Sequence, residues 1–203
     1  MGDRQDVVVD GRDFGPHDNL GIDECVAGGP CNTLDGTTAD SAGRFLQPVP
    51  VHRLLADGFN IVDCATNGVV CEIVVRDFDE PNVALDRTIS FDARLPAPPS
   101  PTVVVDPSSG LADGDTVAVT ASGFAPGETV ASGQCQANAT TTNGCDGGTA
   151  VFGTANGAGQ AVLQLVVHTT ITTSAGPATC TDGCFVVALQ ADKVATAPIS
   201  FGG

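Results

Sequence analysis

The amino-acid sequence contains an internal repeat, and its two copies are offset by 110 residues at both ends. Residues 6–16 resemble residues 116–126 near the start of each copy, and residues 88–91 resemble residues 198–201 at the end. Between these ends the offset shifts by a few residues, as insertions in surface loops do. The repeat therefore predicts two related domains within the 203 residues instead of one larger domain.

A proline-rich segment, 95–101, lies between the two copies and holds four prolines in seven residues. Such a segment favours an extended polyproline conformation and acts as a semi-rigid spacer. The alternative is the start of a strand that the prolines protect. Its position between the copies favours the linker, so we expect one domain at 1–94 and another at 102–203.

The first copy lacks the opening segment of the second. The second copy begins with a valine-rich run, 102–106, and the counterpart of that run at the same offset would precede Met1. We therefore expect that the chain begins inside a domain whose first strand is missing, either because the reading frame is truncated or because the chain is a piece of a longer protein with further tandem domains. Residues 1–9 do not show the basic region and long apolar stretch of a signal peptide.

The local sequence pattern is that of an all-β protein. Short runs rich in Val, Ile, Thr and Leu alternate with turn residues, and no segment keeps a helical apolar period. In the second copy we expect strands at 102–106, 116–121, 129–136, 149–154, 160–167, 184–190 and 197–201. Seven strands in about 100 residues are typical of an immunoglobulin-like antiparallel sandwich. The predicted fold class is two tandem sandwiches of this kind, the first without its N-terminal strand.

The eight cysteines divide equally between the two copies. Four cysteines allow three pairings in each domain, and sequence proximity together with the repeat favours the local one. Zinc binding is the alternative, but separations of six, seven, ten and four residues differ from the closely paired cysteines of zinc ribbons. We therefore expect no metal and an oxidising, extracellular location. The expected disulfides are Cys25–Cys31, Cys64–Cys71, Cys135–Cys145 and Cys180–Cys184.

The net charge of −16, from 24 acidic and 8 basic residues, excludes several classes of partner. Nucleic-acid phosphates and anionic membrane surfaces are bound mainly by cationic side chains, so we expect neither partner. The longest apolar runs, such as 185–189, are too short to span a bilayer. The first copy carries 17 acidic and 7 basic residues and the second carries 7 and 1, an excess that we interpret as a contribution to solubility.

The sequence shows no arrangement typical of a catalyst or a cofactor site. The nucleophile motif Gly-x-Ser-x-Gly is absent, and His52 and His168 follow equivalent strand ends, which favours a structural role. We therefore predict that the protein is not an enzyme and has no cofactor. The acidic segment 77–80 offers oxygen ligands for calcium, but no 12-residue loop of alternating ligands is present. We interpret that segment as a solvated acidic turn.

Residues 101–203 resemble the neocarzinostatin family of chromoprotein apoproteins, and residues 6–94 resemble it more faintly. The matching features are an opening segment with Pro-Ser-Ser-Gly-Leu, a Gly-Gln-Cys segment, a turn with Ala-Asn-Gly-Ala-Gly, two late cysteines and a closing Ile-Ser-Phe. They lie at 102–114, 130–135, 155–159, 180–184 and 199–201.

The resemblance implies a secreted, non-enzymatic antibiotic carrier that protects a small hydrophobic, enediyne-like chromophore. In that family the released chromophore attacks DNA, so any DNA binding belongs to the complex. The alternative function is a ligand-free structural or adhesive repeat of a larger bacterial surface protein.

The resemblance also implies a ligand cleft. A cleft that holds a conjugated molecule needs apolar and aromatic walls. The family carries aromatic side chains at the positions of Ala137 and Ala150. The segment between His168 and Cys180 holds Thr, Ser, Gly, Pro and Ala without a phenylalanine. The cleft candidates are Cys135, Ala137, Cys145, Ala150, Phe152, Phe185 and Gln190.

Overall fold

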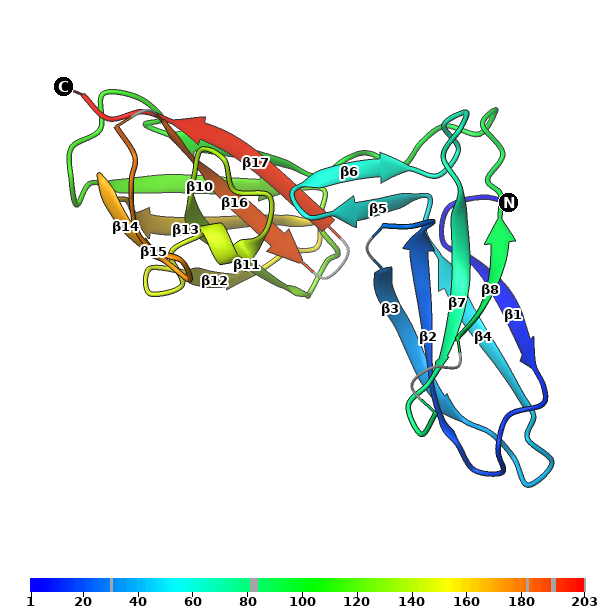
Figure 1. Ribbon diagram of the computed structural model, residues 1–203. Helices are drawn as coiled ribbons and strands as arrows, with labels where there is room; N and C mark the ends of the chain where they lie inside the picture. Colours follow the sequence, from blue (N-terminus) through cyan, green and yellow to red (C-terminus); the bar gives the residue numbers. More distant parts are fainter. Residues whose placement is uncertain (30, 81–83, 182, 191–192, 203) are drawn as a thin grey trace. The chain divides into compact units, whose positions relative to one another are not determined.

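The computed structural model describes residues 1–29, 31–80, 84–181, 183–190 and 193–202, and it confirms the prediction of an all-β protein built from antiparallel sheets (Figure 1). The chain forms two compact units. We call Met1–Asp57 with Val62–Pro98 the first unit, and Gly58–Ile61 with Pro99–Gly203 the second unit.

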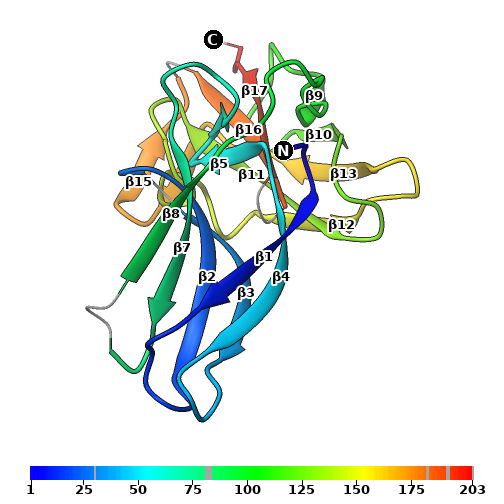
Figure 2. The same cartoon turned by 90° about the vertical axis from the view of Figure 1, so that its right-hand side faces the viewer.

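The strands of the first half of the chain form one four-stranded sheet, in the order β3-β2-β7-β8, and two two-stranded sheets, β1-β4 and β5-β6. Figure 2 shows β1 and β4 crossing the strands of the larger sheet as a separate layer. The strands are β1 (Gln5–Gly11), β2 (Asn19–Val26), β3 (Cys31–Thr38), β4 (Phe45–Val51), β5 (Leu54–Asp57), β6 (Asn60–Asp63), β7 (Cys71–Asp77) and β8 (Ala84–Ile89).

The strands of the second half form a four-stranded sheet, β12-β11-β16-β17, a three-stranded sheet, β13-β10-β9, and the hairpin β14-β15. They are β9 (Thr102–Asp106), β10 (Thr116–Ser122), β11 (Thr129–Gln136), β12 (Val151–Thr154), β13 (Gln160–Val166), β14 (Thr170–Thr173), β15 (Gly176–Thr179), β16 (Cys184–Gln190) and β17 (Lys193–Ile199). Among the described residues, the one helical segment is the short 3-10 helix η1 (Thr142–Gly144). No helix in the described part of the chain is long and apolar enough to cross a membrane.

Strand alternation explains where the core of each unit lies. In β10, Val117 and Val119 are fully buried, whereas Ala118 between them is half-exposed, as the two-residue period of a strand requires. Buried side chains from both larger sheets of the second unit form one core, and a separate core fills the first unit. The strands of the three-stranded sheet therefore bury one face, whereas the central strands β2 and β11 carry runs of buried residues on both faces.

The repeat is visible in the backbone hydrogen bonds as well as in the sequence. The amide of Phe14 donates to Gly43 O at 3.2 Å, and the amide of Phe124 donates to Gly159 O at 3.1 Å. Both glycines have positive φ, 70° and 72°, a conformation that glycine adopts without steric cost. The repeated Gly thus marks the same turn in both units.

Six of the seven strands expected in the second copy correspond to β9, β10, β11, β12, β13 and β16, with ends that differ by two residues or fewer. The bounds expected for the last strand, 197–201, were wrong, because β17 runs from Lys193 to Ile199 and pairs with β16 throughout. The list of expected strands also omitted β14 and β15. Their Thr-, Gly- and Pro-containing sequences lack the apolar alternation on which the prediction relied.

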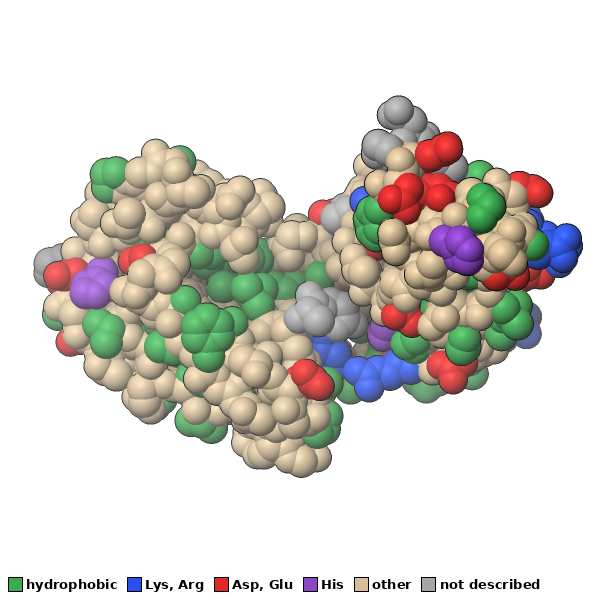
Figure 3. Space-filling model, turned by 90° about the horizontal axis from the view of Figure 1, so that it is seen from below, with side chains coloured by type: hydrophobic (Ala, Val, Ile, Leu, Met, Phe, Trp, Pro, Cys, Tyr) green, Lys and Arg blue, Asp and Glu red, His purple; other side chains and the backbone are tan. Residues whose placement is uncertain are grey.

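The four local disulfides are formed, between Cys25 and Cys31, Cys64 and Cys71, Cys135 and Cys145, and Cys180 and Cys184. Charge is distributed unevenly over the surface. Figure 3 shows acidic and basic side chains gathered on the first unit, whereas the visible face of the second unit carries few of either.

Candidate functional site

The outer face of the four-stranded sheet in the second unit combines small and aromatic side chains. On β11 the outward side chains are those of Ala131 and Cys135, with Gly133 between them. Ala131 lies directly opposite Phe152 of β12, and Cys135 lies directly opposite Phe185 of β16. Side chains directly opposite each other point to the same face. A strip of small residues on β11 is therefore flanked by a phenylalanine on each neighbouring strand.

The loop after β11 is held at one end of this strip. The Cys135–Cys145 disulfide joins the strand to the loop, and the amide of Asp146 donates to Gln134 O at 2.8 Å. The Asp146 carboxylate in turn accepts a hydrogen bond from the amide of Gly148 at 2.9 Å. These contacts fix the course of the loop beside the small-residue strip.

A cavity of about 750 Å³ lies between this loop and the β14-β15 hairpin. The amide and hydroxyl of Ser174 donate to Asn143 O at 3.1 and 2.9 Å, which joins the hairpin to the loop. The wall combines the hydroxyl groups of several threonines and a serine with a similar extent of apolar surface, so it can offer both hydrogen bonds and apolar contact to a ligand. The lining residues are Thr142, Asn143, Cys145, Asp146, Gly147, Gly148, Thr149, His168, Thr170, Thr172, Thr173 and Ser174.

A buried amide fixes the position of His168 in the cavity wall. Gln134 is fully buried, accepts the His168 amide at 2.8 Å, and donates to His168 O at 2.7 Å and to Cys180 Sγ at 3.0 Å. Asp113 lies on the other side of the imidazole, with Oδ1 3.3 Å from Nδ1. The amide of Thr169 donates to the Asp113 carboxylate and, with smaller contributions from the Thr169 hydroxyl and His168, lowers the pKa of Asp113.

The seven cleft candidates occupy different places in the second unit. Phe152 is 68 % exposed on the outer sheet face, and Phe185 is half-buried there. Cys145 lines the cavity, and Ala137 is exposed at the start of the loop. The last three are a buried Cys135, a half-buried Ala150 and a buried Gln190.

The side chain of Gln190 is occupied by the backbone. Its Oε1 accepts the amide of Ala125 at 2.7 Å, and its Nε2 donates to Ala125 O at 3.3 Å. Apart from Cys145, the cavity lining at 142–149 and 170–174 was not among the sequence-based candidates. The only signal in the sequence was the density of Thr and Ser between His168 and Cys180.

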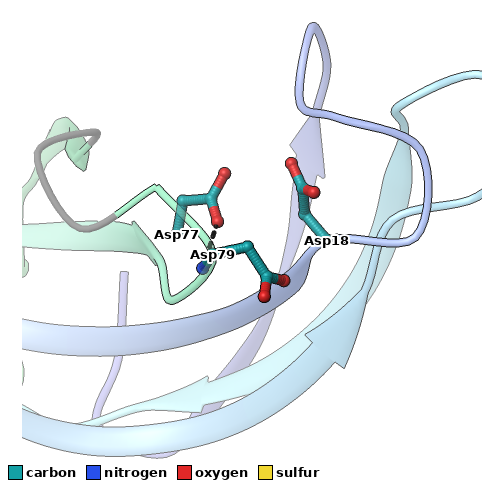
Figure 4. Close-up of side chains that lie close together, drawn as sticks. All are labelled: Asp18, Asp77 and Asp79. Atoms are coloured by element: carbon teal, nitrogen blue, oxygen red, sulfur yellow. Dashed lines mark hydrogen bonds between the residues drawn. The ribbon is translucent and has the colours of Figure 1, made fainter.

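A second group of polar side chains lies in the first unit, where Asp18, Asp77 and Asp79 bring carboxylate oxygens within 4.8 Å of one another (Figure 4). The interpretation of 77–80 as a solvated turn was wrong for Asp77, which is 3 % exposed. Asp77 Oδ1 accepts the amides of Asp79 and Glu80 at 2.9 and 3.0 Å, so its burial is compensated by hydrogen bonds.

Residues at and just before the start of β2 complete the acidic cluster. The amide of Asn19 donates to Asp79 Oδ2 at 2.7 Å. Asp18 Oδ2 is buried and has no hydrogen-bond partner among the residues that the structure describes. Burial raises the pKa of Asp18, and the negative charges of Asp77 and Asp79 act in the same direction. The cluster thus holds a carboxyl group whose ionisation the fold disfavours.

Comparison with known proteins places the second unit in a family. Residues 103–201 match the sequence profile of the neocarzinostatin family. The C-terminal half of the chain belongs to the neocarzinostatin family. Macromomycin from Streptomyces macromomyceticus is 42% identical to the chain over 69 residues. That match spans 34% of this chain and 48% of macromomycin, so the chain covers about half the length of this curated relative.

Two solved structures of the same family match the chain. The structure of macromomycin is 32% identical, with a TM-score of 0.45, and the match covers 50% of this chain and 99% of macromomycin. The solution conformation of apokedarcidin is 31% identical, with a TM-score of 0.42, and the match covers 51% of this chain and 100% of apokedarcidin. The family assignment rests on the sequence match in the second unit.

Proposed function

We propose that the second unit is a non-enzymatic carrier for a small hydrophobic, enediyne-like antibiotic chromophore whose released form attacks DNA. Membership of its sequence in the neocarzinostatin family supports this function. The observation that carries the proposal is the strip of Ala131, Gly133 and Cys135 between two phenylalanines. Gly133 and Cys135 are buried, and Asp146 O lies 3.8 Å from a Cβ built at Gly133. A flat conjugated ring would therefore enter at the half-buried Ala131, beside the exposed ring of Phe152, with Phe185 at the other border.

The hydroxyl-lined cavity next to this strip extends the proposed site. A chromophore that lies on the strip would place polar substituents against Thr172, Ser174 and Asp146, which offer hydroxyl and carboxylate groups. An apolar floor with a few hydrogen-bonding groups at one side is typical of small-molecule sites. The protein would therefore bind and shield its ligand without reacting with it.

The proposed carrier acts outside the cell, because four disulfides persist in an oxidising compartment. We further propose that 1–94 and 102–203 are separate immunoglobulin-like sandwiches joined by the linker 95–101. A net charge of −16 fits a carrier that does not bind DNA through its own surface, so that recognition of DNA is left to the ligand.

A ligand-free structural or adhesive repeat is the second candidate function. The exposed methyl group of Ala137 and the half-buried methyl group of Ala150 favour it, because both stand where the family carries aromatic side chains. Without those rings the strip contacts less of a conjugated ligand. Absence of a ligand in the protein from its natural source would support this candidate.

Ligand binding is tested with the full chain and a neutral naphthoate ester as probe. The protein has no Trp and no Tyr, so probe fluorescence and induced circular dichroism are read without protein background. We expect saturable binding with one probe per chain, and mass spectrometry of the natural protein should detect a co-purified chromophore. If no probe of a polyaromatic panel binds saturably and no chromophore co-purifies with the natural protein, the carrier function is refuted.

The site is located with a matched pair of phenylalanine substitutions. Phe152→Ala should lower probe affinity about tenfold, since an aromatic contact and its buried area are together worth about 1.5 kcal/mol. Phe78→Ala in the first unit is the control, because Phe78 is exposed to a similar extent, 65 % against 68 %. Equal effects of the two substitutions would show that the probe binds elsewhere.

A further inference from the structure

The two units carry the same sheet face with different side chains. Both β2 and β11 are central strands of a four-stranded sheet. The proposed chromophore site lies on the outer face of the sheet that contains β11, so the outer face around β2 is the equivalent surface of the first unit. At the repeat offset of 110 residues, three outward positions correspond: Gly21 to Ala131, Asp23 to Gly133 and Cys25 to Cys135.

In the first unit an aromatic ring already lies on the position where the ligand is proposed to enter in the second. A Cβ atom built at Gly21 would lie 2.7 Å from Cζ of Phe78, so the ring rests directly against this glycine. The amide of Phe78 donates to Asn19 O at 2.9 Å, which holds the backbone of Phe78 beside β2. Gly21 is buried, whereas its counterpart Ala131 is only half-buried although it carries a methyl group.

An ion pair fills the neighbouring positions of the same face. Arg76 lies directly opposite Gly21 on β7, and its Nε lies 3.0 Å from Oδ2 of the buried Asp23. The hydroxyl of Thr33, opposite Asp23 on β3, donates to Asp23 Oδ1 at 2.8 Å. Both carboxylate oxygens of Asp23 thus have a partner, and the guanidinium group of Arg76 is held on the face beside the Phe78 ring.

The second unit carries no charged side chain at these two positions. Gly133 stands in place of Asp23. Leu189, which lies directly opposite Ala131, stands in place of Arg76. A ligand ring on the second unit therefore contacts aliphatic surface. On the first unit it would cover a guanidinium side chain that is 48 % exposed and would remove water from it without offering hydrogen bonds in return.

We propose that Phe78 and the Asp23–Arg76 ion pair close this face of the first unit, so that the conjugated ligand binds to the second unit alone. The inference rests on the carrier function proposed above for the second unit. The Phe78 ring takes the place of a ligand ring on Gly21, and the ion pair makes the surface beside it unfavourable for an apolar molecule. These three side chains are specificity-determining residues, and the chain carries one ligand although it contains the repeat twice.

The test uses the full chain and a neutral naphthoate ester that carries an aryl azide, so that irradiation labels the residues beside the bound probe. We expect the parent chain to bind one probe and to be labelled in the second unit, without label in β2 or β7. The combined variant Asp23→Gly, Arg76→Leu and Phe78→Ala should bind two probes, and the second should label β2 or β7. Label in these strands of the parent chain, or no gain in the combined variant, would overturn the proposal.

A second variant covers a failure to fold. If circular dichroism shows that the combined variant is unfolded, Asp23→Asn replaces Asp23→Gly, because an asparagine retains an acceptor for the Thr33 hydroxyl. The expected gain of one probe is the same.

Removal of another ion pair of the first unit is the matched control. Arg12 Nη2 and Asp10 Oδ2 form an exposed ion pair at 2.7 Å, and Asp10 lies on β1 in a different sheet. Asp10→Gly with Arg12→Leu changes the same two residue types and should leave one bound probe. Phe78→Ala alone should also leave one, because the ion pair of Asp23 remains. A second probe on either variant would contradict the roles given to these side chains.

The result is distinguishable from the outcome for the carrier function. A labelled site that appears in the first unit of the combined variant supports the inference even if the second unit binds no probe, and in that case the carrier function alone fails. Binding to the second unit without a gain in the combined variant overturns the inference and leaves the carrier function standing. Absence of binding to every variant refutes both.

Discussion

The two units place equivalent sequences in different surroundings. Val119 of β10 has a strand on each side, β9 and β13, and is fully buried. Val9 of β1, its counterpart, pairs with β4 alone among the described strands and stays half-buried. The comparison shows that the burial of a residue in a sandwich depends on the strand beside it as much as on its own pattern.

The units also differ in one buried polar side chain at the same position. Gln134 of the second unit and Glu24 of the first are both fully buried and accept the backbone amide of a histidine, His168 or His52. Gln134 also donates to His168 O through its amide group, which an ionised carboxylate cannot do. The second unit therefore satisfies both backbone groups of the histidine with one side chain.

The largest effect on this comparison should come from Gln134→Ala. It removes the two hydrogen bonds of the fully buried Gln134 side chain with the amide and carbonyl of His168, and we expect the free energy of unfolding of the second unit to fall by about 3 kcal/mol. Urea denaturation followed by circular dichroism measures this loss. Gln164→Ala, at an exposed position of β13, is the control and should change it by less than about 0.5 kcal/mol. Similar losses for both would contradict the role given to Gln134.

Removal of one disulfide from each unit tests whether equivalent disulfides contribute equally to the free energy of unfolding of the two units. Replacement of Cys135 and Cys145 by Ala should cost the second unit about 2.5 kcal/mol, and replacement of Cys25 and Cys31 should cost the first unit about as much. The loops differ little in length, with separations of 10 and 6 residues. Denaturation of the two double variants checks this, and a twofold difference between the losses would break the equivalence.

Val119→Ala and Val9→Ala measure the contribution of the covering strand. Loss of two methyl groups from a fully buried site should lower the free energy of unfolding by about 2 kcal/mol, whereas the half-buried Val9 should lose about 1 kcal/mol or less. Denaturation curves of both variants give the two values. An equal loss in the two variants would mean that β1 is as well covered as β10.

The smallest effect should come from Asp18→Asn in the acidic cluster of the first unit. Because burial raises the folded-state pKa of Asp18, ionisation destabilises the fold as pH rises above the ordinary aspartate pKa of about 4. The variant should therefore have a higher melting temperature than the parent at pH 7, and the difference should shrink at pH 3.

Asp40→Asn is the control with the opposite sign. The amides of Arg44 and Ala42 donate to Asp40 and lower its pKa, so ionised Asp40 contributes stability above about pH 4 that is lost as pH falls through the lowered pKa. This variant should melt below the parent at pH 7. Thermal melts of both variants at pH 7 and pH 3 decide, and shifts of the same sign would refute the assigned causes.

Much of the fold could be predicted because the information is local. The cysteines are close in sequence, so the local pairing was the natural expectation, and the alternation of Val117 and Val119 predicted the buried face of β10. The β14-β15 hairpin was missing from the expected strands because its stability comes from tertiary contacts, such as those of Ser174 with Asn143. The cavity that it borders could not be predicted for the same reason.

The sequence by itself determined the repeat, the all-β class, the local disulfides and the family of the second unit, since periodicity, spacing and motifs are properties of the chain alone. The tertiary structure decided which distant residues meet. It brought Asp18 to Asp77, opposed Phe152 and Phe185 to the small residues of β11, and paired Val7 with the buried Val49. Strand register and loop closure set these neighbours, and both depend on packing between segments far apart in the sequence.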